Sequence, residues 1–148
     1  MRSVMVGVVL ALLAGAMSAQ EAPAYTRVGN PYQADFAFKV GQPVGLRVEV
    51  AGLLLSDITV APRHEIEAGK RIKCSVVVHG MGPSEQRVTL HIVLLLEDAG
   101  KRGLERIDLD PFRVKAGKAV DREETVKIGG DTLLGASRIY LFAEVEKE

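Results

Sequence analysis

Two histidines and a methionine are the residues whose types come closest to a metal site. His79 and His91 fall on the outward phase of two alternating segments, and Met81 follows two positions after His79. Imidazole and thioether groups are ligands that copper accepts. If the two segments were neighbours, the pattern would suit a periplasmic copper-binding sandwich. The residues lack a defined ligand spacing, so we assign no metal ligand and keep metal handling as an alternative function.

Two aspartates, Asp108 and Asp110, flank Leu109 and therefore point to the same face of a strand. Two close carboxylates can share a proton or contribute to a calcium site. Calcium requires six or more oxygen ligands, however, and Ile107 and Leu109 occupy the opposite face of the segment. A water-facing strand edge is the simpler interpretation of this pair.

The only cysteine, Cys74, is in phase with Ile72, Val76 and Val78, which predicts an inward side chain that packs as a small hydrophobe. A single cysteine excludes an internal disulfide. The chain also lacks a G-x-S-x-G nucleophile motif, a phosphate-binding glycine loop and a C-x-x-C pair. We therefore assign no catalytic residue and no cofactor, and we expect a protein that is not an enzyme.

Apolar and polar residues alternate through most of the chain after residue 36. The clearest run extends from Val88 to Leu96, with five apolar residues in phase. This period of two is typical of strands that place one face in a core. Similar runs occupy residues 46–50, 58–60, 72–78, 107–109, 112–114, 126–128 and 139–145.

Glycine-containing turns separate these runs and set the number of strands. They occur at Ala51-Gly52, Ala68-Gly69-Lys70, Gly80-Met81-Gly82-Pro83, Ala99-Gly100, Ala116-Gly117-Lys118 and Gly129-Gly130. No segment after residue 20 shows a helical period. Seven to nine short strands at this spacing predict an all-β, antiparallel β-sandwich.

The N-terminal residues have the features of a signal peptide. Arg2 precedes an apolar run from Val4 to Ala16, and small residues up to Ala19 suit a signal peptidase. We predict a signal peptide over residues 1–19, a flexible tether over residues 20–35 and a single sandwich domain over residues 36–148. The alternative is an uncleaved anchor, because the uncharged stretch of 17 residues is near the lower limit for spanning a bilayer. We expect contact with a membrane only through this segment, and only if it is uncleaved.

The composition excludes several classes of partner. The chain has 19 basic and 19 acidic side chains, so it lacks the basic surplus of a nucleic-acid binder or a polybasic membrane-surface protein. It has three tyrosines, four phenylalanines and no tryptophan, which gives little flat aromatic surface for sugar binding. An accessory domain of a hydrolase or carbohydrate-active system is therefore the weakest alternative.

Three features between residues 56 and 145 carry a family resemblance. They are the proline-bounded strand ending in Val60-Ala61-Pro62, the turn Ala68-Gly69-Lys70, and the long strand from Ile72 to His79 that ends at Gly80. This outline resembles bacterial extracytoplasmic immunoglobulin-like modules, including fibronectin-type and cell-adhesion-related domains. The absence of tryptophan and of a second cysteine excludes the antibody-type branch. The resemblance implies a domain that binds, spaces or scaffolds, and it implies no catalytic residue.

Some apolar residues fall on the outward phase of the predicted strands. If their strands share a sheet, they form an outer contact face made of Val77, Val93, Leu95, Tyr140 and Phe142. A monomer rarely leaves a large apolar patch open. We expect the segment from Phe36 to Leu55, which contains Leu53-Leu54-Leu55, to cover this face. The alternative is cover by a partner protein or by a second copy of the chain.

These observations together predict an exported, non-catalytic module. We expect a secreted or periplasmic β-sandwich that binds or scaffolds proteins in the cell envelope, with an envelope or extracellular protein, or a second copy of the chain, as its partner.

Overall fold

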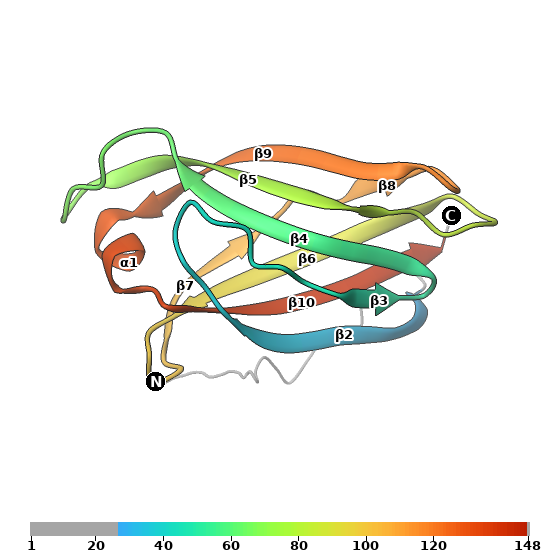
Figure 1. Cartoon of the computed structure of the whole chain (residues 1–148), viewed down its shortest axis with the longest axis horizontal. Coiled ribbons are helices and arrows are strands. Elements are labelled where there is room, and N and C mark those ends of the chain that lie inside the picture. Colours follow the sequence, from blue (N-terminus) through green and yellow to red (C-terminus); the bar gives the residue numbers. More distant parts are fainter. Residues whose placement is uncertain (1–26, 148) are drawn as a thin grey trace.

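The computed structural model describes residues 27–147, which fold mainly as antiparallel strands (Figure 1). Strands account for 62% of these residues and helix for 5%. The strands form two sheets whose inner faces enclose one hydrophobic core. This confirms the predicted all-β class with antiparallel sheets.

The larger sheet has five strands, and its central members carry the residues of most interest. Its order is β2 (Arg27–Ala37), β10 (Arg138–Lys147), β6 (Val88–Glu97) and β7 (Gly103–Asp108), and β8 (Phe112–Val114) also pairs with β6. Because β7 and β8 pair with opposite ends of β6, they share one edge of that strand. The strands β10 and β6 are thus flanked on both sides.

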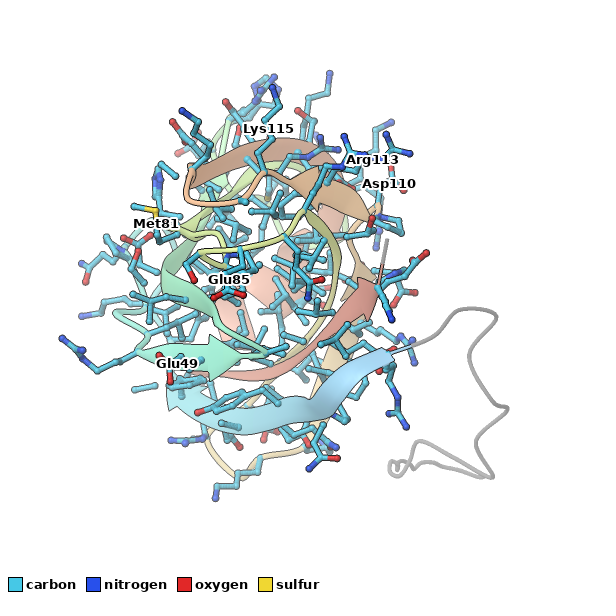
Figure 2. All side chains as sticks on the ribbon, turned by 90° about the vertical axis from the view of Figure 1, so that its right-hand side faces the viewer. Glu49, Met81, Glu85, Asp110, Arg113 and Lys115 are labelled. Atoms are coloured by element: carbon cyan, nitrogen blue, oxygen red, sulfur yellow. The ribbon has the colours of Figure 1, made fainter. Side chains whose placement is uncertain are left out.

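The smaller sheet has four strands and lies above the first in Figure 1. Its order is β3 (Val48–Val50), β4 (Leu53–Pro62), β5 (Arg71–Met81) and β9 (Ala119–Gly129). The side chains from both sheets fill the space between them, as Figure 2 shows from the end of the molecule.

The alternation in the sequence sorts residues correctly between core and surface. Leu94 and Leu141 of the larger sheet and Val76 of the smaller one are at most 1% exposed. Cys74 is buried as expected, and its Sγ lies 3.5 Å from the Ile72 carbonyl oxygen. Burial raises the pKa of the Cys74 thiol, and the charge of Glu105 adds to this effect.

The first strand extends the fold beyond the predicted domain boundary. Residues 27–35, which we expected in a tether, belong to β2 and pair with β10. Their alanine, proline, asparagine and tyrosine content and the Asn30-Pro31 step suggested a tether. Gly29 and Pro31 lie where the pairing register shifts, while Val28, Tyr32 and Phe36 pack against the core. The predicted signal peptide and residues 20–26 lie outside the described residues.

A short helix, α1 (Gly130–Gly135), replaces the turn that Gly129-Gly130 predicted. The Gly130 N–H donates to the Lys70 carbonyl oxygen at 2.7 Å, and a Cβ at this position would overlap the Glu67 carbonyl oxygen. Glycine is therefore required by this close approach. Six residues are too few to show a helical period. Among residues 27–147, no helix is long and apolar enough to cross a membrane.

Candidate contact face

Four of the five predicted contact residues form one block on the outer face of the larger sheet. In the pairing of β10 with β6, Tyr140 lies opposite Leu95 and Phe142 lies opposite Val93. Each of the four side chains is partly exposed. Directly opposed residues of antiparallel strands have side chains in contact. We call these four residues the outer patch.

The fifth residue, Val77, lies on the other sheet. It belongs to β5, where it pairs with Thr59 on one side and Glu123 on the other. The sequence places Val77 correctly on an outward face, because alternation reveals which side of a strand a residue occupies. Alternation does not reveal which strands are neighbours. It therefore could not show that Val77 lies on a different sheet from the outer patch.

The segment from Phe36 to Leu55 does not cover the outer patch, in contrast to our expectation. Its apolar side chains, including Phe38, Leu53 and Leu55, are buried between the two sheets. Leu53 and Leu55 belong to β4, so they fill the inner face of the smaller sheet. The apolar side chains that we expected to cover the outer patch are buried in the core instead.

Polar residues flank the outer patch along both neighbouring strands. On the β2 side, the Tyr140 hydroxyl donates to Oε1 of Gln33 at 2.6 Å. On the β7 side, Arg106 pairs with Asp108 at 2.8 Å, and these residues lie opposite Leu95 and Val93.

Burial raises the pKa of Tyr140, and the negative charges of nearby carboxyl groups raise this pKa further. The phenol is therefore neutral and available as a hydrogen-bond donor.

One end of the outer patch is closed by an ion pair and by a hydrogen bond between a histidine and a carboxyl group. Glu144 follows Phe142 in the outward phase of β10, and Arg27 pairs with it at 3.4 Å. Beside them, Nε2 of His91 lies 2.7 Å from Oε1 of Glu146. These contacts connect the beginnings of β2 and β6 with the end of β10.

The other end contains a buried carboxyl group. Glu97 lies directly opposite Arg138 in the pairing of β6 with β10, and it is only 6% exposed. Arg138 Nε, however, donates to Oδ1 of Asp35 on β2 at 3.0 Å. Among the described residues, Oε1 of Glu97 is buried and has no hydrogen-bond partner.

The environment of Glu97 favours its protonated form. Burial is the main cause, followed by the hydrogen bond with Asp35 and by the negative charge of Asp35, whereas Arg138 and Lys101 act in the opposite direction. Together, these effects raise the pKa of Glu97 from 4.5 to about 7. Two carboxyl groups thus lie near one arginine at this end of the outer patch, and that arginine pairs with Asp35.

The other residues singled out in the sequence do not converge. His79 lies on β5 of the smaller sheet, 3.4 Å from Asp121, whereas His91 lies on the outer face of the larger sheet. Met81 is 46% exposed at the end of β5. Within residues 27–147, no group of three or more His, Cys, Asp or Glu side chains is placed to hold a metal ion.

Asp108 and Asp110 are both exposed and have separate partners. Asp108 pairs with Arg106, and the backbone N–H of Asp110 donates to the Glu124 carboxylate at 3.1 Å. Figure 2 shows Asp110 on the surface near Arg113. The water-facing arrangement that the sequence favoured therefore holds for both residues.

A shallow depression of about 210 Å³ lies between β8 and β9. The guanidinium of Arg122 lies 5.2 Å from the ring centre of Phe112 in its wall. Arg122 and Glu124 point inward from β9, which is the edge of the smaller sheet. Inward charges at a sheet edge disfavour the addition of another strand. We therefore interpret this region as a protected edge.

The sequence reasoning missed the carboxyl pair of Glu97 and Asp35. The one available signal was phase, because Glu97 follows Val93 and Leu95 on the same outward face. Its burial depends on the alignment with Arg138 and on the presence of β2 beyond it. Both depend on pairings between distant segments.

Comparisons with known proteins do not assign a family. No protein-family model matches this chain, and no curated protein matches it at a significant level.

Proposed function

We propose that this chain is an exported, non-catalytic immunoglobulin-like module that binds or scaffolds proteins in the cell envelope, and that the outer patch is its contact surface. The observation that carries the proposal is the contiguous block formed by Val93, Leu95, Tyr140 and Phe142 on the two central strands. A contiguous apolar patch rimmed by polar residues is typical of a protein-protein contact site.

The strand order supports the immunoglobulin-like part of the proposal. In that fold, strands A, B and E are neighbours in one sheet, and strands G, F and C are neighbours in the other. Here β4, β5 and β9 follow the A-B-E order, and β10 and β6 follow the F-C order. The position of strand G is taken by β2, which comes from the N-terminal side of the domain.

The export part of the proposal rests on the sequence. The apolar run from Val4 to Ala16 after Arg2 has the composition of a signal peptide. A domain that folds without a disulfide must rely on its core, and two sheets of buried aliphatic residues provide one. Within residues 27–147, the geometry does not favour metal handling, because His79 and His91 lie on different sheets.

The test uses the difference between two valines. We would express the tagged full chain in its native host as wild type, Val93→Ser and Val77→Ser, cross-link intact cells and identify proteins captured from the envelope. Both valines are partly exposed and outward, but only Val93 belongs to the outer patch. A partner captured with wild type and Val77→Ser, and lost at least tenfold with Val93→Ser, supports the proposal.

Two results would contradict this proposal. Equal capture by all three proteins excludes the outer patch as the contact surface. Retention of the whole chain in the cytoplasm, measured by fractionation of the same cells, excludes an exported module. Circular dichroism of each purified variant provides the control for folding.

A further inference from the structure

One end of the outer patch contains a buried carboxyl group, Glu97, that has no ion-pair partner of its own among the described residues. Along the rim, Asp108 has Arg106 and Asp35 has Arg138 as ion-pair partners. Glu97 forms no ion pair among the described residues and lies beside the arginine that Asp35 already engages. A carboxyl that is more than nine-tenths buried normally requires hydrogen-bond donors or a cation.

We propose that the outer patch binds a protein segment in which a lysine or arginine side chain accompanies apolar side chains, and that this cation pairs with Glu97. The inference rests on the proposed function, because it names the chemistry of the partner at the same contact surface. The apolar side chains would lie on the block around Tyr140 and Phe142. The cation would enter at the end where Glu97 and Leu95 are in phase on β6.

The position of Glu97 fits this role. Its neighbour in phase, Leu95, is part of the outer patch, so one extended segment can reach both residues. Pairing requires Glu97 to turn its carboxyl group towards the patch by a change to another staggered rotamer. An arginine is well suited, because its planar group donates two parallel hydrogen bonds to a carboxylate.

In the free protein, the raised pKa of Glu97 allows a proton to neutralise this carboxyl group below about pH 7. The charged groups that face Glu97 are Asp35 on β2, Arg138 on β10 and Lys101 in the following loop, and Tyr140 on β10 is also nearby. Their net effect and burial hold the pKa of Glu97 near 7. A bound cation would displace the proton, so binding would strengthen as the pH rises.

The expected size of this effect follows from the titration. If only the ionised form of Glu97 pairs with the cation, the affinity rises about tenfold between pH 6 and pH 8, because a group with a pKa near 7 changes from mostly protonated to mostly ionised. The Glu97→Gln variant should bind more weakly at pH 8, and its affinity should change less than twofold over the same range.

The test needs no knowledge of the natural partner. A phage-displayed library of random twelve-residue peptides is selected at pH 8 on the purified chain, and clones that also bind Phe142→Ser are discarded. We expect the remaining clones to combine at least two apolar residues with a lysine or arginine. Selection on Glu97→Gln should keep the apolar residues and lose the basic one. Affinities of synthetic peptides from single clones, measured at pH 6 and pH 8, provide the second readout.

The outcomes separate this inference from the proposed function. Clones that depend on Phe142 but carry neutral or acidic residues overturn the cation site and leave the contact surface in place. If no clone depends on Phe142, both proposals fail. If the chain alone dimerises and Phe142→Ser is a monomer, a second copy occupies the patch and the inference of a cationic partner is wrong. The fold of Glu97→Gln is checked by its thermal unfolding.

Discussion

The outer faces of the two sheets differ although both contain outward apolar residues. On the larger sheet, Val93 lies opposite Phe142 and next in phase to Leu95, so apolar side chains touch one another. On the smaller sheet, Val77 lies between Thr59 and Glu123. A single exposed valine is ordinary for a protein surface, whereas a contiguous block is typical of a contact site. The distinction depends on neighbours across strands, and residue type alone does not reveal it.

The two faces also differ in how deeply their charged side chains are buried. On the larger sheet, Glu97 is buried and lies beside an ion pair that joins β2 to β10. On the smaller sheet, charged residues such as Glu123 pair with exposed partners, here Arg63 at 3.4 Å. Exposed pairs contribute little to stability, whereas a buried carboxyl makes stability depend on pH.

The largest expected effect separates the inner face of β6 from its outer face. Leu94 is completely buried, and Leu95 is its partly exposed neighbour. We expect Leu94→Ala to lower the free energy of unfolding by about 2–5 kcal/mol, because it leaves a cavity in the core, and Leu95→Ala to lower it by about 1 kcal/mol. Urea denaturation measures both. Equal losses would show that the outer patch is covered as fully as the core.

The second prediction concerns Glu97. The unfolded chain releases this proton near pH 4.5 and the folded protein near pH 7, so wild type loses stability as the pH rises between these values, by about 3 kcal/mol in total. Glu97→Gln cannot ionise and should lack this loss. We would measure urea denaturation of both proteins at pH 5, 6, 7 and 8.

The control for this prediction is Glu49→Gln, which changes an exposed carboxyl group on the smaller sheet (Figure 2). We expect it to follow wild type at every pH. If the curves of wild type and Glu97→Gln stay parallel from pH 5 to pH 8, the proposed protonation of Glu97 is wrong.

The third prediction concerns the contact between Tyr140 and Gln33 at the edge of the outer patch. Tyr140→Phe removes the hydroxyl that donates at 2.6 Å and should cost about 1 kcal/mol. A double-mutant cycle with Gln33→Ala measures the coupling between the two side chains in urea denaturation. A coupling near zero would show that water replaces this hydrogen bond without loss.

The smallest effect is expected on the smaller sheet. Val77→Thr preserves a β-branched side chain at a partly exposed position and should change the free energy of unfolding by no more than about 0.5 kcal/mol. Binding to any partner of the outer patch should remain as in wild type. A measurable loss of binding would extend the contact surface to both sheets and would remove the contrast between them.

Much of the fold can be predicted from local patterns. Alternation identified the inward residues of β5, β6 and β10, and glycines with positive φ occupy three of the expected turns, at Gly52, Gly69 and Gly117. Both signals depend on residues close in sequence. They indicate which side of a strand is buried and where it ends.

Features that depend on distant segments could not be predicted. β2 contains Gly29 and Pro31, so its pattern resembles a tether until β10 provides a neighbour. The separation of Val77 from Val93 requires the assignment of strands to sheets. The burial of Glu97 requires the alignment of three strands. In each case the deciding contact joins residues far apart in the chain.

The pairing of β2 with β10 has a consequence for how the protein is made. Asp35 and its ion-pair partner Arg138 are 103 residues apart, so the first described strand has no neighbour until the last one has been synthesised. Contacts of such long range form late and slowly. The nascent chain therefore leaves the ribosome with its larger sheet still open. The late completion of this sheet is compatible with the export that we propose for the chain.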